Sequence, residues 1–165
     1  MRFRTDTIHA THIDTALGGV LLAATDLGLC GLWFDAQRHA PRTIGWRMDV
    51  AHPVLRAAAS QLTDYVEGRR RVFDLPLDLS HGTAFQQAVW QELRAIPRGA
   101  TLSYGAISQR LGRPMATRAV GGAVGRNPIS VVVPCHRVVG ASGALTGYAG
   151  GLDRKRALLA LESAG

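Results

Sequence analysis

A cysteine followed by a histidine and an arginine, Cys135-His136-Arg137, is the part of this sequence best suited to covalent chemistry. A thiol reacts as its thiolate, so a neighbouring base and nearby positive charge both favour attack on an electrophile. The preceding residues 131–134 are three valines and a proline, which predicts a buried strand that stops or bends at Pro134. Cys135 would then stand at the end of a rigid element. The alternative is a structural cysteine that precedes a histidine by chance.

Several further motifs surround this cysteine in a fixed order. They are Phe85-Gln86-Gln87-Ala88-Val89-Trp90, Ile96-Pro97-Arg98-Gly99, Ser103-Tyr104-Gly105, Arg118-Ala119-Val120-Gly121, Gly125-Arg126-Asn127-Pro128 and the Gly-rich residues 143–152. Together with the cysteine motif, this ordered set resembles the O6-alkylguanine-DNA alkyltransferase family over residues 83–162. The first half of the chain is similar to the variable N-terminal domain of that family only loosely.

Length and composition are those of a globular protein with one or two small domains. The chain has 165 residues, of which 47% are hydrophobic and 19% charged, so it can bury a core and is not a disordered chain. No apolar run is long enough to span a bilayer, and residues 1–6 lack the apolar core of a signal peptide. Cys30 and Cys135 are expected to be free thiols in the cytoplasm, where a disulfide would also consume the nucleophile.

The positive charge is confined to the second half of the chain. Residues 1–82 hold nine Arg and nine Asp or Glu, whereas residues 83–165 hold ten Arg or Lys and three Asp or Glu, which accounts for the net charge of +7. This asymmetry predicts an anionic partner for the second half, with the phosphate backbone of a nucleic acid as the leading candidate. The alternative is that this positive charge is spread over the surface and only keeps the protein soluble.

The first half has the pattern of an α/β domain, and we place it at residues 1–80. Three β-rich runs, residues 8–15, 19–24 and 27–34, predict an antiparallel meander with Cys30 in its core. Apolar residues at helical spacing predict a helix over 53–66. Residues 72–79 alternate like an edge strand. By resemblance to the family, this domain is expected to be ribonuclease-H-like.

The second half, residues 81–165, has helical patterns and a helix-turn-helix signature. Thr83 and Gln86 form a capping-box pattern at the start of a helix. Short helices over 104–111 and 115–124 are separated by Gly112-Arg113-Pro114, a spacing typical of helix-turn-helix DNA-binding units. The expected fold is therefore an α/β (α+β) domain followed by a helical, winged-helix-like domain.

The second of these short helices is unusually rich in small residues. Adjacent Gly121 and Gly122 weaken a helix, so either a neighbouring helix or a nucleic-acid groove must approach closely. The family resemblance implies insertion into the minor groove, with Arg118 filling the gap left by a flipped base. The residues expected to contact DNA are Arg113, Thr117, Arg118, Ala119, Gly122, Ala123 and Arg126.

The resemblance also implies a mechanism in which Cys135 accepts the alkyl group. Glu162, on a helix over 153–162, orients His136, which draws the thiol proton through a bridging water, and Tyr104 helps to flip the nucleotide and protonate it. Asn127 acts as a hinge, and Arg137 is structural, pairing with Glu162 or with another carboxylate. The residues expected around the flipped base are Val124, Ser130, Val138, Tyr148 and Ala149.

Substrate and partners follow from the same resemblance. The expected substrate and partner is double-stranded DNA that carries O6-alkylguanine. The expected activity is that of a methylated-DNA–protein-cysteine methyltransferase, which reacts once and irreversibly. No cofactor and no metal are expected. O4-alkylthymine as a further substrate, cooperative assembly of a monomer on DNA, and the effect of Ala149 on the accepted alkyl group stay open. A lesion-binding protein without transfer and a cysteine hydrolase are the competing functions.

Overall fold

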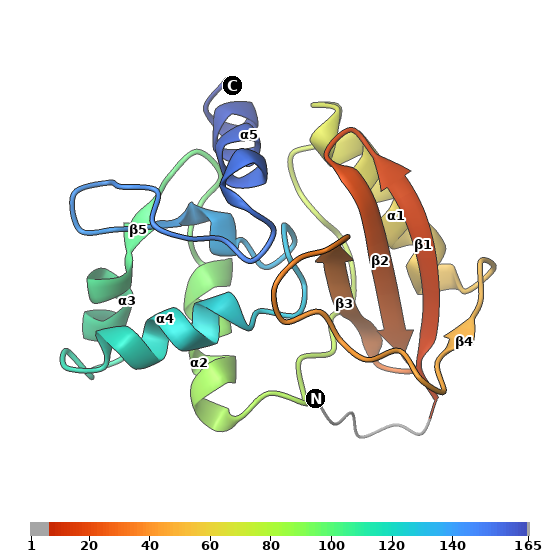
Figure 1. Cartoon of the computed structure of the whole chain (residues 1–165), viewed down its shortest axis with the longest axis horizontal. Coiled ribbons are helices and arrows are strands. Elements are labelled where there is room, and N and C mark those ends of the chain that lie inside the picture. The colour runs from red at the N-terminus through yellow and green to blue at the C-terminus, as the bar shows by residue number, and fades with distance from the viewer. Residues whose placement is uncertain (1–6, 165) are drawn as a thin grey trace.

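A four-stranded sheet forms most of the first half of the computed structural model, which describes residues 7–164 (Figure 1). Strands β1 (His9–Thr15), β2 (Gly18–Thr25) and β3 (Gly28–Phe34) are antiparallel neighbours, which confirms the predicted meander. Strand β4 (Arg47–Met48) pairs in parallel with β1 and had no signal in the sequence. The expectation of no signal peptide rests on residues 1–6, which lie outside the described part.

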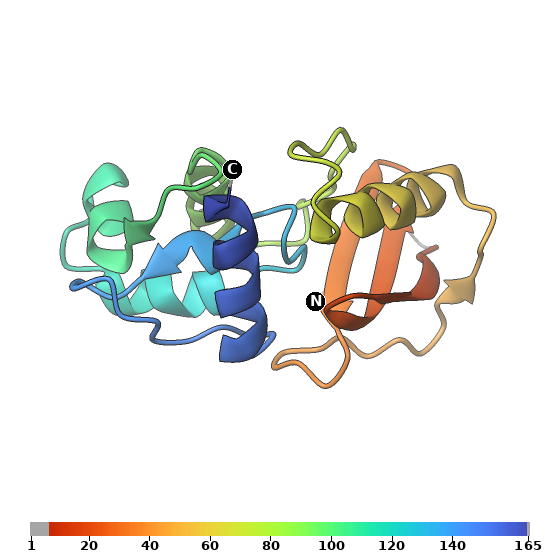
Figure 2. The same cartoon turned by 90° about the horizontal axis from the view of Figure 1, so that it is seen from above.

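Helix α1 (Pro53–Val66) covers one face of this sheet, with the bounds that the apolar spacing predicts (Figure 2). Pro53 fits the first helical position because its missing N–H has no intrahelical partner there. The side chain of His52 caps the helix by accepting a hydrogen bond from the backbone N–H of Val54. The buried residues on the sheet-facing side are Leu55, Ala58, Leu62 and Tyr65.

The expected edge strand over 72–79 is wrong, because only Leu77 makes an isolated bridge, to Leu29 of β3. Pro76 lacks an N–H for a ladder, yet its carbonyl accepts a hydrogen bond from Leu29. Further along the same edge, Leu32 donates to the carbonyl of Pro128 in the second half of the chain. The edge of β3 is thus covered by two irregular segments.

The second half contains helices α2 (Ala84–Arg94), α3 (Tyr104–Arg110), α4 (Thr117–Gly125) and α5 (Leu152–Ser163). Two short parallel strands, β5 (Leu102–Ser103) and β6 (Val138–Val139), lie among them. The Thr83–Gln86 capping box is present at the start of α2. Helices α3 and α4 pack together as a helix-turn-helix unit requires, but the connection over 111–116 is longer than the Gly-Arg-Pro turn that we expected.

The larger of two apolar core clusters runs through both halves of the chain, whereas the smaller one, around Cys30 and Trp33, belongs to the sheet half. The larger cluster includes Leu22 and Leu32 of the sheet, Leu62 of α1 and Val89 of α2, all fully buried. The division at residue 80 therefore stays a prediction, since packing does not stop there. Within residues 7–164, none of the helices is long and apolar enough to cross a membrane.

Candidate active site

The segment that presents Cys135 is buried but is not a strand, which corrects the expectation for residues 131–134. The backbone turns sharply, with Val131 at φ 70°. The side chain of Asn127 supplies the hydrogen bonds that a neighbouring strand would otherwise make. Its Nδ2 donates to the carbonyl of Val133 at 2.8 Å, and its Oδ1 accepts from the N–H of Ile129 at 3.0 Å. An apolar run can be buried without a ladder when a side chain satisfies its backbone groups.

Cys135 opens a short 3-10 turn, Cys135–Arg137, and is only 5% exposed. Burial raises the pKa of the thiol, because the charged thiolate loses its hydration. A hydrogen bond from Asn127 and the positive charge of Lys155 oppose that shift without cancelling it. The resting group is therefore a neutral thiol, and a base must remove its proton before the sulfur can attack.

His136 is the base that the geometry supplies. Its ring is fully buried, and its Nε2 lies 2.6 Å from Oε1 of Glu162. Burial lowers the pKa of the imidazole, although the bond to Glu162 opposes this shift, so the ring is neutral at pH 7. Since the carboxylate can only accept, we assign the hydrogen to Nε2. Nδ1 then carries a lone pair, and it has no hydrogen-bond partner within residues 7–164.

Glu162 is held as an anion by a network that spans both halves of the chain. Burial alone would raise the pKa of its carboxyl group, but hydrogen bonds from His136 and Arg137 outweigh this effect and lower the pKa below its ordinary value. Arg137 donates to both carboxylate oxygens at 2.9 Å, which confirms the predicted pairing. Tyr65 of α1 donates its hydroxyl to Oε1 of Glu162 at 2.5 Å. Sequence reasoning missed Tyr65 because it lies 97 residues from its partner.

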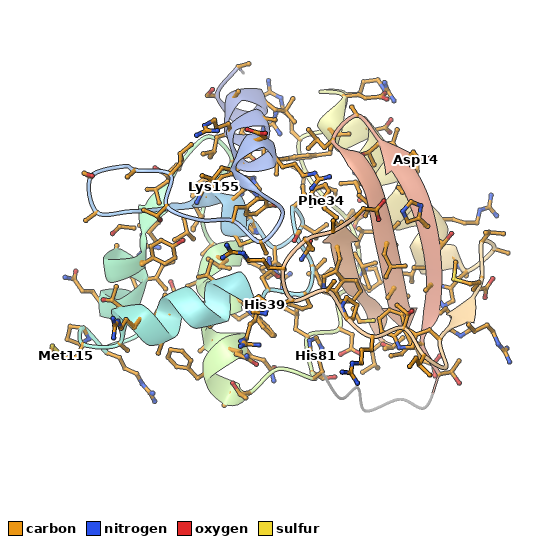
Figure 3. All side chains as sticks on the ribbon, viewed as in Figure 1. Asp14, Phe34, His39, His81, Met115 and Lys155 are labelled. Atoms are coloured by element: carbon orange, nitrogen blue, oxygen red, sulfur yellow. The ribbon has the colours of Figure 1, made fainter. Side chains whose placement is uncertain are left out.

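Lys155 is a second residue that sequence reasoning missed. It lies on α5 (Figure 3), is fully buried, and donates through Nζ to the carbonyls of Val138 and Gly147 at 2.6 and 2.8 Å. Burial lowers the pKa of its ammonium group. These bonds fix the strand after the cysteine turn against the loop that carries Tyr148. The only signal in the sequence was the position of this lysine three residues before Leu158, on the same face of the predicted helix.

A cavity of about 270 Å³ opens beside the thiol. Its lining brings together residues from the helix-turn-helix unit, the cysteine turn and the Gly-rich loop. They are Arg38, His39, Tyr104, Gly121, Gly122, Val124, Gly125, Arg126, Cys135, Gly147, Tyr148 and Ala149. Seven of these residues were expected at the site. Ser130 and Val138, which we also expected around the flipped base, are not in this lining.

Ser130 and Val138 are buried behind this cavity, at 1% and 0% exposure. Val138 begins β6 and pairs with Leu102 of β5, so its side chain belongs to the core. Ser130 lies close enough to Cys135 and Tyr148 for its hydroxyl to lower the pKa of each, against the larger raising effect of burial. Both residues therefore support the cavity from outside its lining.

Arg38 and His39 come from the sheet half, in the loop that follows β3, and had no signal in the sequence. The N–H of Arg38 donates to the carbonyl of Ala149 at 3.0 Å. Gln37 holds the loop by accepting a hydrogen bond from the N–H of Phe34 at 2.8 Å. Figure 3 shows His39 beside the C-terminal end of α4. The first half of the chain thus forms one wall of the cavity.

Arg154 of α5 fastens the two halves on the same side. Its Nε donates to the carbonyl of Leu17, in the turn between β1 and β2, at 2.8 Å. Its guanidinium lies over the ring of Phe34 at 4.7 Å from the centroid, and Nη1 donates to the carbonyl of Gly150. A cation above an aromatic face stabilises such a contact. The Gly-rich loop is therefore positioned from both halves.

Helix α4 presents a slim, cationic surface next to the cavity. Thr117, Arg118 and Ala119 are exposed at its N-terminal end, and Gly122 is exposed one turn later. A Cβ added at Gly122 would meet nothing within 4 Å. At Gly121 it would only touch the ring of Tyr104 at 3.9 Å. Internal packing therefore does not require these glycines.

One residue of α4 differs from the expected set of DNA contacts. Ala123 is 4% exposed, and its carbonyl accepts the indole N–H of Trp90 at 2.9 Å, so it faces the core and not a partner. Arg113 is exposed in the connection before α4, where its guanidinium lies 5.6 Å from the ring centroid of Phe85. Met115, at the tip of this connection, is 96% exposed (Figure 3).

Metal-ligating residues do not gather at this site. Within residues 7–164, no group of three or more His, Cys, Asp or Glu lies close enough together to hold an ion. Cys30 lies elsewhere, in the sheet core, where burial raises the pKa of its thiol to about 12. Of the two cysteines, only Cys135 lies beside a base and a cavity.

Two family models match the chain in the order of its two halves. Residues 8–79 match the ribonuclease-like domain of 6-O-methylguanine DNA methyltransferase. Residues 84–164 match the DNA binding domain of the same enzyme. The two matches together cover nearly all of the described residues, including every residue that lines the cavity.

Similar proteins come from several bacteria. A methylated-DNA–protein-cysteine methyltransferase from Mycolicibacterium paratuberculosis is 49% identical to this chain. The aligned region covers 91% of this chain and 89% of the relative. A protein of the same description from Haemophilus influenzae is 39% identical, and the aligned region covers 94% of this chain and 86% of that relative. The crystal structure of Mycobacterium tuberculosis OGT in complex with DNA superposes with a TM-score of 0.87 at 47% identity, covering 94% and 93%.

Proposed function

Because this chain belongs to the 6-O-methylguanine DNA methyltransferase family, we propose that it repairs alkylated DNA by transferring the alkyl group of O6-alkylguanine to Cys135. The observation that carries this proposal is a buried thiol beside a neutral histidine whose other nitrogen is bonded to an ionised carboxylate. In such an arrangement a base next to the thiol can take its proton as the sulfur attacks. The chain supplies one acceptor sulfur per molecule, and nothing in the cavity offers a route to remove the product.

DNA would reach this site through α4. Gly121 and Gly122 permit a close approach of the helix backbone to a minor groove about 6 Å wide. Arg118 is exposed on the same surface and would occupy the space of the flipped nucleotide. Flipping is necessary because the O6 atom inside a duplex cannot contact a thiol that is 5% exposed. Arg113, Thr117 and Arg126 would bind the flanking phosphates.

Tyr104 and Tyr148 would receive the extruded base, since both line the cavity beside Cys135. The thiol proton passes through a bridging water to Nδ1 of His136, and the resulting imidazolium is stabilised by Glu162. The sulfur then bonds to the alkyl carbon while the bond from that carbon to O6 breaks. The electron pair stays on the purine, which takes a proton from the Tyr104 hydroxyl. Tyr104 then regains a proton and His136 gives one up through the surrounding water, so guanine is restored and a thioether remains on Cys135.

The narrower expectations about partners belong to the same proposal. Cys135 must remain reduced to react, which favours the cytoplasm as its location. A monomer carries a complete set of catalytic residues, so transfer needs no second copy. Residues from both halves of the chain line the cavity. Transfer from O4-alkylthymine and from larger O6-alkyl groups is therefore tested by changing the lesion in the DNA, with the protein left unaltered.

Duplex DNA with an isotopically labelled O6-methyl group separates transfer from the competing functions. We expect one label per molecule on Cys135 by intact mass and peptide mapping, with no label on Cys135→Ser although that variant still binds the duplex. Cys30→Ala is the matched control and should retain transfer, because Cys30 lies in the sheet core. Binding without label would identify a lesion sensor, and release of the label as free product would identify a hydrolase.

A further inference from the structure

A second cavity, of about 340 Å³, lies behind the Glu162 network, and we propose that it binds a nucleoside phosphate. We call it the arginine cavity, after Arg71, Arg94, Arg98 and Arg137 in its lining. It shares no lining residue with the cavity beside Cys135. The function proposed above does not use it.

The first argument is charge. The lining contains four arginines and no Asp or Glu. Arg137 is neutralised by Glu162, which leaves three cations with no carboxylate beside them in the lining. Arg71 and Arg94 are exposed, and within residues 7–164 neither side chain has an ion-pair or hydrogen-bond partner. Like charges held around one concave surface favour an anion there, more strongly than charges on a flat surface.

The second argument is the state of Arg98. Its Nη2 donates to the carbonyl of Leu161 at 3.2 Å, and its guanidinium lies 5.0 Å from the ring centroid of Tyr65. Its Nε and Nη1 are buried and have no hydrogen-bond partner among the described residues. Buried guanidinium donors are costly to leave unpaired, so Arg98 is a cation with hydrogen-bonding capacity that the described residues do not use. A ligand phosphate would offer an acceptor to one of these donors.

The third argument is the apolar part of the lining. The rings of Phe73 and Tyr65 stack at 4.6 Å. Leu75, Val131 and Val132 add aliphatic side chains to the same lining. A volume of about 340 Å³ exceeds what an inorganic ion needs and falls within the range of small-molecule sites. The combination fits a flat heterocycle joined to a phosphate, which is the chemistry of a nucleotide.

The location of the arginine cavity separates it from the proposed duplex site. In Figure 1 the chain immediately after α1 and the chain immediately after α2 lie in the upper half, whereas α4 lies in the lower half. The ligand could be a free nucleotide or the phosphorylated end of a nucleic-acid strand, since both present the same group. Through Arg137, which bonds Glu162, the site also touches the network that orients His136.

The test is a calorimetric titration of the full chain with deoxyadenosine monophosphate, which carries no O6 atom for the alkyl-transfer site. We expect saturable binding to one site, and at least tenfold weaker binding in the double variant Arg71→Gln/Arg94→Gln. The matched control is Arg47→Gln/Arg56→Gln, which removes two exposed arginines of the sheet half that have no side-chain partner within the described residues. If the double variant unfolds, Arg71→Gln alone takes its place.

Three further ligands identify what is bound. Deoxyadenosine without phosphate should bind at least tenfold more weakly than the monophosphate. A single-stranded tetranucleotide with a 5′-phosphate, compared with its 5′-hydroxyl form, shows whether a strand end can enter, whereas binding of the mononucleotide alone indicates a free nucleotide. Absence of saturation by deoxyadenosine monophosphate at millimolar concentration, or equal weakening in the control variant, would overturn the proposal. Neither outcome bears on alkyl transfer, which is read on Cys135.

Discussion

His136 and Glu162 are joined by a 2.6 Å hydrogen bond inside the protein, with both side chains at 1% exposure or less. This single contact decides which nitrogen of the imidazole is free to take a proton. Because Glu162 is ionised and accepts from Nε2, the lone pair on Nδ1 remains available next to the cysteine turn. The chemistry of Cys135 therefore depends on a residue 27 positions away in the sequence.

Replacing Glu162 with glutamine should slow transfer far more than it weakens DNA binding. The neutral amide no longer fixes the imidazole tautomer and no longer stabilises the imidazolium that forms. Loss of one component of general-base catalysis lowers the rate by about 10²- to 10⁴-fold. The rate constant is measured in single-turnover reactions at saturating duplex. Glu92→Gln, on the surface of α2, is the matched control, and a similar loss in both variants would contradict the role of Glu162.

The free energy of unfolding should depend on pH through the same carboxyl group. Since the folded-state pKa of Glu162 is lowered, its contribution is complete above the unfolded pKa of about 4.3. That contribution is lost as pH falls from there toward the folded-state pKa. Urea unfolding at pH 6 and pH 3.5 should therefore show a smaller pH dependence in Glu162→Gln than in the unaltered protein. Equal pH dependence in the two would argue against an ionised Glu162.

Transfer itself should be nearly independent of pH between 6.5 and 8.5. His136 stays neutral over this range because burial lowers its pKa, and Cys135 stays a thiol because burial raises its pKa. The reacting pair is thus in the same protonation state throughout. A free thiol has a pKa of about 8.5. Below that pH, its reaction rate would instead rise about tenfold for each unit by which the pH increases, because the thiolate fraction rises in the same proportion. Such a slope in single-turnover rates would show that a solvent-exposed thiolate is the reactive form.

Gly122→Ala should make the protein more stable and its DNA complex weaker. Alanine stabilises a helix by about 1 kcal/mol relative to glycine, and the new Cβ meets nothing inside the protein. A groove pressed against the helix backbone would meet that methyl group, and Gly122→Leu should weaken binding further. Gly105→Ala in α3 is the control, because a Cβ there also has open space. Unchanged duplex affinity in both Gly122 variants would place the interface elsewhere.

Asn127→Ala should lower the free energy of unfolding by about 2–6 kcal/mol. It leaves the buried carbonyl of Val133 and the N–H of Ile129 without their partner, and each unpaired group costs about 1–3 kcal/mol. Because these bonds hold the segment before Cys135, transfer should slow even where the variant is fully folded. Denaturant titration and single-turnover rates measure the two effects. A stable variant with unchanged transfer would show that the segment holds its shape without Asn127.

Local patterns in the sequence were sufficient for the regular elements. The meander, the bounds of α1 and the Thr83–Gln86 capping box depend on residues within a few positions of one another, so their chemistry is visible along the chain. The ordered motifs around Cys135 also identified the family and most of the cavity lining. In each case the determining contacts are short-range, or are carried by a motif.

Patterns failed where one side chain replaces a regular partner. Residues 131–134 have the composition of a strand, but Asn127 satisfies their backbone and the chain turns at Val131. Similarly, residues 72–79 alternate like a strand, yet β3 takes only one bridge from them because the edge is shared with residues near Ile129. The β-propensity of a residue measures how well its side chain fits a half-buried pleated surface. Tertiary packing decides whether the segment forms a hydrogen-bonded ladder with a neighbouring strand.

The sequence by itself determined most of the regular elements, and it predicted Cys135 as the nucleophile, His136 as its base and Glu162 as the carboxylate that orients the base. Only the tertiary structure decided that Tyr65, Arg38 and His39, from the sheet half, join a site built by the helical half. It also decided that both Cys135 and His136 are uncharged at rest. The physical reason is that hydration and long-range contacts set these properties, and neither is encoded in the spacing of residues along the chain.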